Sequence, residues 1–338
     1  MIVLCVLVFV FDGAGDLENG MRRTAPEGGR IMDVILTVNG LCKYYKHEKA
    51  LDGLCLSVPK GAIYGLVGQN GSGKTTLFRL LTGLQQPSGG EFTLYGIRNH
   101  EKGIEKARRR MSAIVETPAI YRDMTAKDNL RQQYRILGLP SEKGIDELLH
   151  LVGLGDTGSK KAGNFSLGMR QRLAIAIALA GDPDFLMLDE PVNGLDPQGI
   201  IEIRELILNL NRDRQITILI SSHILEELSK LATHYGFIDH GHMVKEINAR
   251  ELEEACRKSL RLTVSDGKAL APVLDGLQAE YCFLSEQEAE IYSEIPITKL
   301  VCTLADTGCE VLSMQEREES LESYYIRLIG GGRYEQTV

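Results

Sequence analysis

The chain has 338 residues, of which 43% are hydrophobic and 25% are charged, as in an ordinary soluble protein of about two domains. Its formal net charge of -8 argues against nucleic acid as the main ligand. Seven scattered cysteines without a Cys-x-x-Cys pair argue against a disulfide framework or a zinc site, and they favour a reducing cytoplasm.

The first 31 residues precede any regular pattern. Residues 1–11 are apolar, but they lack the basic region of a signal peptide and are too short to span a membrane. Our hypothesis is that translation starts at Met32, because residues 27–29, Glu-Gly-Gly, can be encoded by a purine run that resembles a bacterial ribosome-binding site. Codons there that avoid such a run would remove this support. We therefore expect residues 1–31 to be a non-native or disordered extension.

Residues 34–95 are predicted to form several short strands, interrupted by one helix. An apolar strand enters residues 68–75, Gly-Gln-Asn-Gly-Ser-Gly-Lys-Thr, which fully match the phosphate-binding P-loop pattern. Because this loop leads into a helix, its backbone N–H groups and the helix N-terminus converge on an anion. The alternative, a glycine-rich turn with a chance Lys-Thr pair, becomes weaker with each motif that follows.

The P-loop predicts a nucleotide and a metal ion as ligands. Lys74 can reach the β- and γ-phosphates, and the hydroxyl of Thr75 can hold Mg²⁺, which keeps much of its water and needs only one or two protein ligands. We expect the phosphate-binding residues to be Gly68, Asn70, Gly71, Ser72, Gly73, Lys74, Thr75 and Thr76.

A helix-rich stretch at residues 125–180 is followed by two apolar strands, residues 185–188 and 216–220, which flank a helical pattern at residues 200–210. Strands that alternate with helices predict a parallel sheet covered on both faces. Ligands of such sheets bind at the carboxyl ends of the strands, and the P-loop is at one such end.

Two carboxylates follow the first of these apolar strands. Asp189 can hold Mg²⁺ there, directly or through water, and Glu190 can orient or deprotonate the attacking water. The alternative is that both are simple solvent-facing residues at the end of a strand.

The pattern changes after residue 247, and we place a domain boundary near Asn248. The expected order is strand, helix, two-stranded hairpin, helix and strand, before a terminal helix, and this β-α-β-β-α-β order is that of a ferredoxin-like unit. The expected strands are residues 260–264, 281–284, 291–294 and 309–314. The apolar helix faces are Leu270, Val273, Leu274 and Leu277, then Ile297, Leu300, Val301 and Leu304, and last Leu321, Tyr324, Tyr325 and Leu328.

Two histidines, His240 and His242, flank Gly241 and could suggest a metal pair. They lie between the apolar pairs at residues 237–238 and 243–244, so the pattern favours a hairpin turn.

Three further motifs occur downstream of the P-loop. They are Phe-Ser-Leu-Gly-Met-Arg-Gln-Arg at residues 165–172, Asn-Gly-Leu-Asp at residues 193–196 and Ser-Ser-His at residues 221–223. With the P-loop and the acidic strand end in this order, the chain from Val34 to about Ile247 resembles the nucleotide-binding subunit of an ABC transporter. Residues 166–169, Ser-Leu-Gly-Met, stand where the family has its Leu-Ser-Gly-Gly-Gln signature, and these departures resemble the bacitracin-resistance and lantibiotic-immunity branch.

We therefore expect an α/β fold in three parts. Residues 1–31 are the extension, and residues 32–247 form a P-loop ATPase core with a mostly parallel sheet and a helical subdomain at about residues 118–180. Residues 248–338 form a small C-terminal α+β accessory domain, whose element order is ferredoxin-like.

The resemblance implies roles for single residues. Tyr45 would stack on adenine, with Tyr44 as its competitor for that role and a partly buried strand tyrosine as the alternative. Lys74, Glu190 and His223 would be catalytic, with Glu190 as the general base. His223 would contact the γ-phosphate, although a histidine after an apolar strand is often structural.

The resemblance also implies that two copies of the chain share each nucleotide. Ser166 and Gly168 would meet the γ-phosphate of ATP on the opposing protomer, and Asp196 would bridge the protomers. A signature loop does not reach the P-loop of its own chain in this family, so we expect a head-to-tail dimer around two ATP molecules.

Glu116 ends an apolar strand at the position where most of the family has a glutamine that links the nucleotide to the membrane subunit. An ionised glutamate only accepts hydrogen bonds, and near the γ-phosphate it would add negative charge beside Asp189 and Glu190. We expect Mg²⁺ or a proton to offset that charge. The alternative is an exposed loop residue that faces the permease and has no role in the chemistry.

The leading hypothesis is an ATPase that uses ATP and Mg²⁺ and powers a separate multi-span membrane permease. It would be cytoplasmic, peripheral on the inner face of the plasma membrane, and would export a peptide antibiotic or a similar compound. The alternative is a soluble ABC ATPase that acts as a regulatory or translation-associated factor, which the single P-loop, the lack of sustained heptads and the acidic balance disfavour. A protein that only holds ATP is disfavoured by the pair Asp189 and Glu190, and a GTPase by the lack of an Asn-Lys-x-Asp element.

Overall fold

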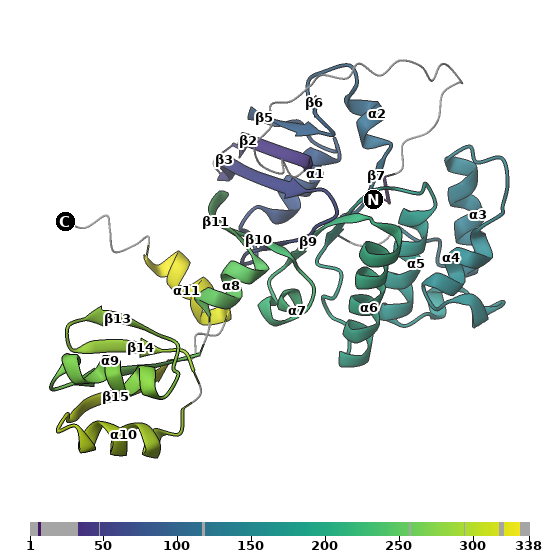
Figure 1. Cartoon of the computed structure of the whole chain (residues 1–338). Helices are drawn as coiled ribbons and strands as arrows, with labels where there is room; N and C mark the ends of the chain where they lie inside the picture. Colours follow the sequence, from purple (N-terminus) through teal and green to yellow (C-terminus); the bar gives the residue numbers. More distant parts are fainter. Residues whose placement is uncertain are drawn as a thin grey trace, which may run out of the picture. The chain divides into compact units, whose positions relative to one another are not determined.

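We describe the protein from a computed structural model (Figure 1). The structure describes residues 6–7, 33–46, 48–116, 119–256, 258–293, 295–317 and 321–331. They belong to two compact units, Met1–Asn248 and Ala249–Val338. Apart from Val6–Leu7, the extension expected at residues 1–31 lies outside the described residues.

The larger unit is built around a mixed, mostly parallel sheet, as expected. Among the described residues, seven strands pair in the order β1-β7-β8-β9-β4-β10-β11. The strands from β7 to β10 run parallel, whereas β1 and β11 are antiparallel at the two edges. Strands β4, β8 and β9 are buried at every position, which accounts for their apolar sequences. The bounds are β1 (Val6–Leu7), β7 (Met111–Ile114), β8 (Phe185–Asp189), β9 (Thr217–Ser222), β4 (Ile63–Val67), β10 (His234–Asp239) and β11 (His242–Asn248).

Parallel strands bring the predicted motifs to one edge of this sheet. The P-loop follows β4, and Asp189 is the last residue of β8. Glu116 lies two residues after β7, and His223 directly follows β9. Because the carboxyl ends of parallel strands meet at the same edge, motifs that are far apart in the sequence become neighbours.

A second, antiparallel sheet shares a core with the first. Its strands pair in the order β3-β2-β5-β6, with bounds β3 (Glu48–Pro59), β2 (Val34–Tyr45), β5 (Gly89–Leu94) and β6 (Ile97–Arg98). Leu36 of β2 and Phe92 of β5 belong to one buried cluster with Phe78 of α1 (Lys74–Leu81) and Phe185 of β8. The helix that follows the P-loop is therefore fixed by packing on both sheets, and a short helix, α2 (Ile104–Arg108), leads on to β7.

The helix-rich stretch contains α3 (Ala126–Ile136), α4 (Ile145–Leu151) and α5 (Leu167–Leu179), which lie together with α6 at the right of Figure 1. Short 3-10 turns, Gly155–Thr157 and Ala162–Asn164, precede α5. Helix α6 (Pro197–Arg214) extends the predicted helix at both ends, because Asp196 caps it and Pro197 suits its first turn. A short helix, α7 (Leu225–Ser229), follows β9.

The smaller unit has the element order β-α-β-β-α-β, with one helix before it and one after it. Among its described residues, four strands pair antiparallel in the order β13-β14-β12-β15. Leu262, Leu270, Leu274, Leu300 and Leu304 are fully buried in its core. The bounds are α8 (Ala249–Ala255), β12 (Ser259–Val264), α9 (Gly267–Gly276), β13 (Tyr281–Ser285), β14 (Glu288–Ile291), α10 (Ile297–Asp306), β15 (Val311–Arg317) and α11 (Leu321–Gly331).

Two details of this unit correct the sequence-based expectations. The second strand of the hairpin is Glu288–Ile291 rather than residues 291–294, because a tight connection pairs Tyr281 with Ile291 and turns Ala289 and Ile291 into the core. On α10, Leu300 and Leu304 are buried as expected, but Ile297 and Val301 are exposed, so the buried stripe is narrower than predicted.

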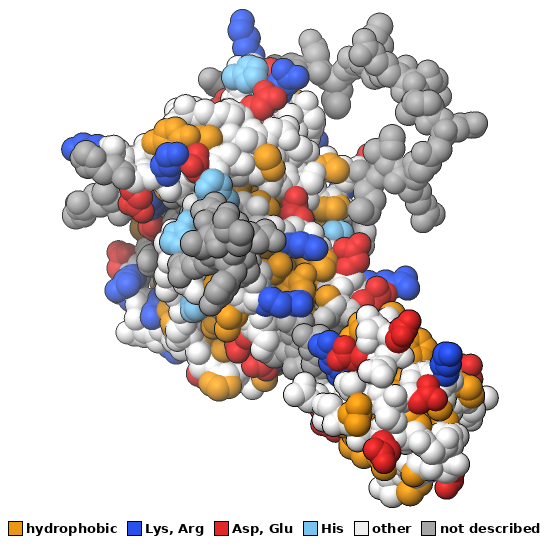
Figure 2. All heavy atoms as spheres, turned by 90° about the vertical axis from the view of Figure 1, so that its left-hand side faces the viewer, with side chains coloured by type: hydrophobic (Ala, Val, Ile, Leu, Met, Phe, Trp, Pro, Cys, Tyr) orange, Lys and Arg blue, Asp and Glu red, His pale blue; other side chains and the backbone are white. Residues whose placement is uncertain are grey.

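Acidic and basic side chains are interspersed on the face of the molecule that Figure 2 draws. None of the helices in the described ranges combines the length and the apolar character that crossing a bilayer requires.

Candidate functional site

A cavity of about 280 Å³ opens at the P-loop. Its lining comes from the β2–β3 hairpin, the P-loop, α1 and the residue after β8: Tyr45, Glu48, Ala50, Asn70, Gly71, Ser72, Gly73, Lys74, Thr75, Thr76, Arg79 and Glu190. The structure thus brings most of the predicted phosphate-binding residues together with the predicted general base. Gly68 is outside this lining but begins the loop.

The loop can adopt its path only with glycine at certain positions. Gly73 has a φ of 108°, and a Cβ there would lie 2.5 Å from the carbonyl oxygen of Ala50. A Cβ on Gly68 would lie 2.6 Å from the carbonyl oxygen of Ile238. These approaches are far closer than van der Waals contact, so both glycines are needed to bring the backbone N–H groups of the loop to one point.

Lys74 is the first residue of α1, at the end of the loop, and is only 5% exposed. Its Nζ donates to the carbonyl oxygens of Gly68 (2.6 Å) and Gln69 (3.1 Å). The same Nζ lies 3.3 Å from Oε1 of Glu190. The ammonium group is therefore held where the oxygens of a bound phosphate chain could replace the two carbonyl partners.

Asp189 is 4% exposed and is held by two hydroxyl groups. The hydroxyl of Thr75 donates to its Oδ2 (2.8 Å), and the hydroxyl of Ser221 donates to its Oδ1 (2.6 Å). Burial raises the pKa of Asp189, and the two hydrogen bonds oppose that shift.

This donor set fits Mg²⁺. The metal prefers oxygen ligands and needs only one or two from the protein when phosphates and water supply the rest. Thr75 and Asp189 offer one hydroxyl and one carboxylate side by side. The described residues contain no group of three or more His, Cys, Asp or Glu side chains that could hold a metal by themselves.

Glu190 lies between two basic side chains. Its Oε2 lies 2.8 Å from Nδ1 of His223, and its Oε1 faces Lys74. Its backbone has a φ of 49°, which is unusual for a non-glycine residue and costs about 1–3 kcal/mol. Two hydrogen bonds from its N–H to Ser221, to the carbonyl oxygen (3.2 Å) and the hydroxyl (2.9 Å), hold that conformation. The carboxylate is thus fixed at the cavity rather than free at a strand end.

The P-loop also contains a side-chain oxygen that is available to hydrogen-bond a ligand. The hydroxyl of Ser72 is buried and has no hydrogen-bond partner within the part of the chain that the structure describes. Buried polar groups almost always have partners, so an unpaired one at a cavity is consistent with a polar ligand such as a phosphate.

Of the two candidate adenine-stacking residues, Tyr45 lines the cavity and Tyr44 does not. The hydroxyl of Tyr45 donates to Oε1 of Gln85. The hydroxyl of Tyr44 donates to Oδ1 of Asp52 (3.2 Å).

Ser166, Gly168 and Asp196 do not line the cavity. Ser166 caps α5 by accepting from the N–H of Met169 (3.2 Å), and Asp196 caps α6 by accepting from the N–H of Gly199 (3.1 Å). A Cβ on Gly168 would lie 3.8 Å from the Cα of Gly199, so the starts of the two helices lie side by side. These residues form a separate cluster within the unit.

Glu116 is outside the lining too, and it is 46% exposed. Its carboxylate pairs with the guanidinium of Arg79, which does line the cavity. We expected Mg²⁺ or a proton to offset the charge of Glu116. In the structure, the guanidinium of Arg79 on α1 offsets it.

Sequence reasoning gave no role to Ser221 or Arg79. Ser221 lies opposite Asp189 in the register of β8 and β9, and only that pairing shows the contact. For Arg79 a signal was present, since it follows Thr75 by four residues on a helix and must share its face.

The two histidines beside Gly241 lie in a tight β10–β11 turn, which confirms the hairpin prediction. Asp239 pairs with His242 across it, and His240 and Gly241 both have a positive φ, as this kind of turn requires.

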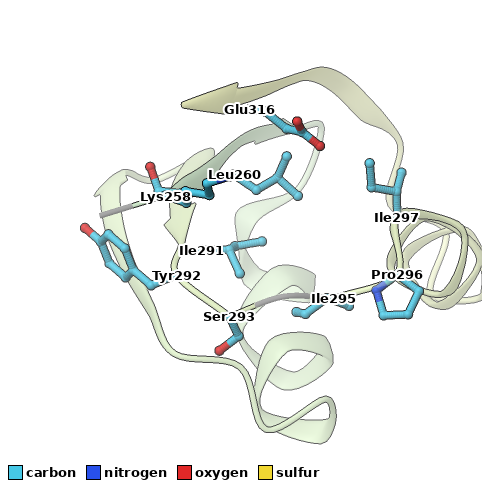
Figure 3. A pocket seen from close by; sticks show the side chains of 10 residues that line it. Lys258, Leu260, Ile291, Tyr292, Ser293, Ile295, Pro296, Ile297 and Glu316 are labelled. Atoms are coloured by element: carbon cyan, nitrogen blue, oxygen red, sulfur yellow. The ribbon is translucent and has the colours of Figure 1, made fainter. Parts of the chain in front are cut away.

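A larger cavity of about 510 Å³ lies in the smaller unit (Figure 3). Leu260, Ile291 and Ile297 face its interior, and Glu316 lies at its rim. Its described lining contains no glycine and a single carboxylate, so it offers none of the phosphate and metal chemistry that the P-loop cavity offers.

Comparison with known proteins identifies a family for the part of the chain that contains the P-loop. The family model described as ABC transporter matches residues 51–193. The chain is 40% identical over 304 residues to the bacitracin transport ATP-binding protein BcrA of Bacillus licheniformis, covering 89% of this chain and 99% of that protein. It is 41% identical over 212 residues to the lantibiotic transport ATP-binding protein SrtF of Streptococcus pyogenes, covering 63% of this chain and 90% of that protein.

A solved structure shares the fold of the larger unit. It is cbiO1 of Clostridium perfringens, part of the ABC transporter complex cbiONQ, with a TM-score of 0.59 and 27% sequence identity. The match covers 66% of this chain and 91% of that chain.

Proposed function

The chain belongs to the ABC transporter family, as an ATP-binding ATPase subunit, and we propose that it powers a separate membrane permease that exports a peptide antibiotic. The observation that supports ATP hydrolysis as the source of that power is the fixed position of Glu190 at the P-loop cavity, between Lys74 and His223. A chain that only held ATP would not need a carboxylate oriented in this way.

Each of the residues at the cavity would have its own role in ATP hydrolysis. Lys74 would take the β- and γ-phosphates, and Thr75 and Asp189 would hold Mg²⁺. The metal, when bound, would offset the charge of the phosphate oxygens. Glu190 would accept a proton from the attacking water, and His223 would hold Glu190 and contact the γ-phosphate.

A second copy of the chain would complete the site. Ser166, Gly168 and Asp196 cluster at the starts of α5 and α6, outside the cavity lining. In the proposed dimer this cluster faces the γ-phosphate that the other copy holds at its P-loop. ATP would therefore join the two copies head to tail, and hydrolysis would release them.

The names of the relatives suggest the cargo, since one is a bacitracin and another a lantibiotic transport protein. We expect co-expression of this chain with its permease subunit to raise the bacitracin concentration that bacterial cells tolerate. Either protein expressed alone should have no effect, and nisin in place of bacitracin tests the lantibiotic alternative. Tolerance that does not change for either compound would contradict the proposed cargo.

We further propose that the smaller unit is a ferredoxin-like accessory domain without catalytic residues. Its element order and antiparallel sheet support this. A chain truncated after Asn248 should keep its ATP affinity within about threefold, because the cavity lining lies entirely before that residue. Isothermal titration with ATP measures this, and loss of binding in a truncated protein that remains folded would contradict it.

A further inference from the structure

Arg79 lies beside the nucleotide cavity without a role in the chemistry described so far. It follows Thr75 by one helical turn on α1, so the two side chains share a face of that helix. It also lines the cavity, and its guanidinium pairs with the carboxylate of Glu116.

The pair of Arg79 and Glu116 matters for nucleotide binding because of the negative charges around the cavity. Three carboxylates gather at this edge of the sheet, those of Glu116, Asp189 and Glu190, before any phosphate arrives. Lys74 is already placed against Glu190. A nucleotide adds further negative charge, and like charges at short range disfavour one another. Glu116 therefore needs a cation of its own, and Arg79 supplies it.

The backbone of Glu116 indicates that its position is held. Its φ of 62° is in the left-handed region, which non-glycine residues seldom adopt. The ion pair attaches this residue, two positions after β7, to the helix that carries Thr75.

We propose that Arg79 is a positioning residue that acts through Glu116. It cancels the charge of Glu116 and holds the carboxylate on α1, the helix that carries Thr75. The inference rests on the proposed function, since it assumes that ATP binds at the P-loop cavity.

A competing explanation is an ordinary surface ion pair. Arg79 is 29% exposed and Glu116 is 46% exposed, and pairs of this kind contribute little to stability. In that case single substitutions would barely change the affinity for ATP. The two explanations therefore differ in what Arg79→Gln alone does to the affinity for ATP.

The test is a double-mutant cycle on the full-length chain, with ATP affinity measured by isothermal titration in EDTA and again in Mg²⁺. Arg79→Gln should weaken ATP binding roughly tenfold in EDTA, because the cavity then loses a cation and the negative charge of Glu116 near it is unpaired. The loss should be smaller in Mg²⁺, which offsets part of the charge. The variant with both Arg79→Gln and Glu116→Gln should bind ATP within about threefold of Glu116→Gln alone. Arg79→Lys should stay within about threefold of the unaltered chain, since it keeps the charge.

Rescue by removal of Glu116 is the result that a purely structural role does not predict. The matched control is the exposed pair of Lys127 and Asp146, whose side chains are 40% and 69% exposed. Lys127→Gln and Asp146→Asn should leave ATP affinity unchanged singly and together.

Three outcomes would overturn the inference. If Arg79→Gln has no effect, the pair is an ordinary surface contact. If it costs the same affinity with and without Glu116→Gln, Arg79 contacts the phosphates directly instead of acting through Glu116. If the unaltered chain binds no ATP, the proposed function fails and the inference fails with it.

Discussion

Glu190→Gln should lower the rate of ATP hydrolysis by about a hundred- to ten-thousand-fold while ATP remains bound. Glutamine keeps the shape of glutamate, so the side chain can stay between Lys74 and His223. Its amide cannot accept a proton from water, so the chemical step loses its base. Phosphate release by the purified chain in Mg²⁺ and ATP measures the rate, and isothermal titration measures the affinity.

The control for this variant is Glu226→Gln. Glu226 is a glutamate of α7 whose side chain is 76% exposed and pairs with Lys230. Its replacement should leave both rate and affinity unchanged. Hydrolysis by Glu190→Gln at the unaltered rate would remove Glu190 from the role of general base.

The same variant also tests the proposed dimer. If ATP joins two copies and hydrolysis separates them, a chain that binds but does not cleave ATP should accumulate as a dimer. Size-exclusion chromatography with light scattering should then show twice the monomer mass in ATP and the monomer mass without it. A Glu190→Gln chain that stays monomeric in saturating ATP would contradict the shared site.

The predictions from the sequence were most accurate where the structure is determined by residues adjacent in the chain. The P-loop, the Asp189-Glu190 pair and the turn at Gly241 are contiguous segments, and their geometry is local. The alternation of apolar strands with helices also predicted the mostly parallel sheet, because both faces of such a sheet must be covered. From that sheet it followed that the P-loop and Asp189 lie at one edge.

The contacts that could not be predicted from the sequence depend on which strands are neighbours in the sheet. Ser221 meets Asp189 only because β9 pairs with β8. Glu116 meets Arg79 because β7 pairs with β8, the strand that α1 contacts. Sequence spacing carries no information on either pairing. The predicted position of the second hairpin strand in the smaller unit was wrong for a related reason. The register that buries Ala289 is set by the strands on either side of it.

Lys74→Ala should weaken ATP binding by about a hundredfold or more and abolish measurable hydrolysis. The ammonium group is almost fully buried, and it lies 3.3 Å from Oε1 of Glu190. Its removal deletes the phosphate contact and also takes away the buried cation that faces Glu190, close to where the phosphates must bind. Both effects oppose binding, so the affinity should fall by a hundredfold or more, about 2.7 kcal/mol.

Thermal unfolding gives a readout of this loss that does not depend on turnover. A ligand that binds only the folded state stabilises it by about 2.7 kcal/mol at a concentration of a hundred times its Kd. The melting temperature of the unaltered chain should therefore rise in saturating MgATP, whereas that of Lys74→Ala should barely move. Lys127→Ala, at an exposed lysine of α3, should behave like the unaltered chain. A Lys74→Ala protein with full ATP-dependent stabilisation and full hydrolysis would show that the phosphates bind elsewhere than in this loop.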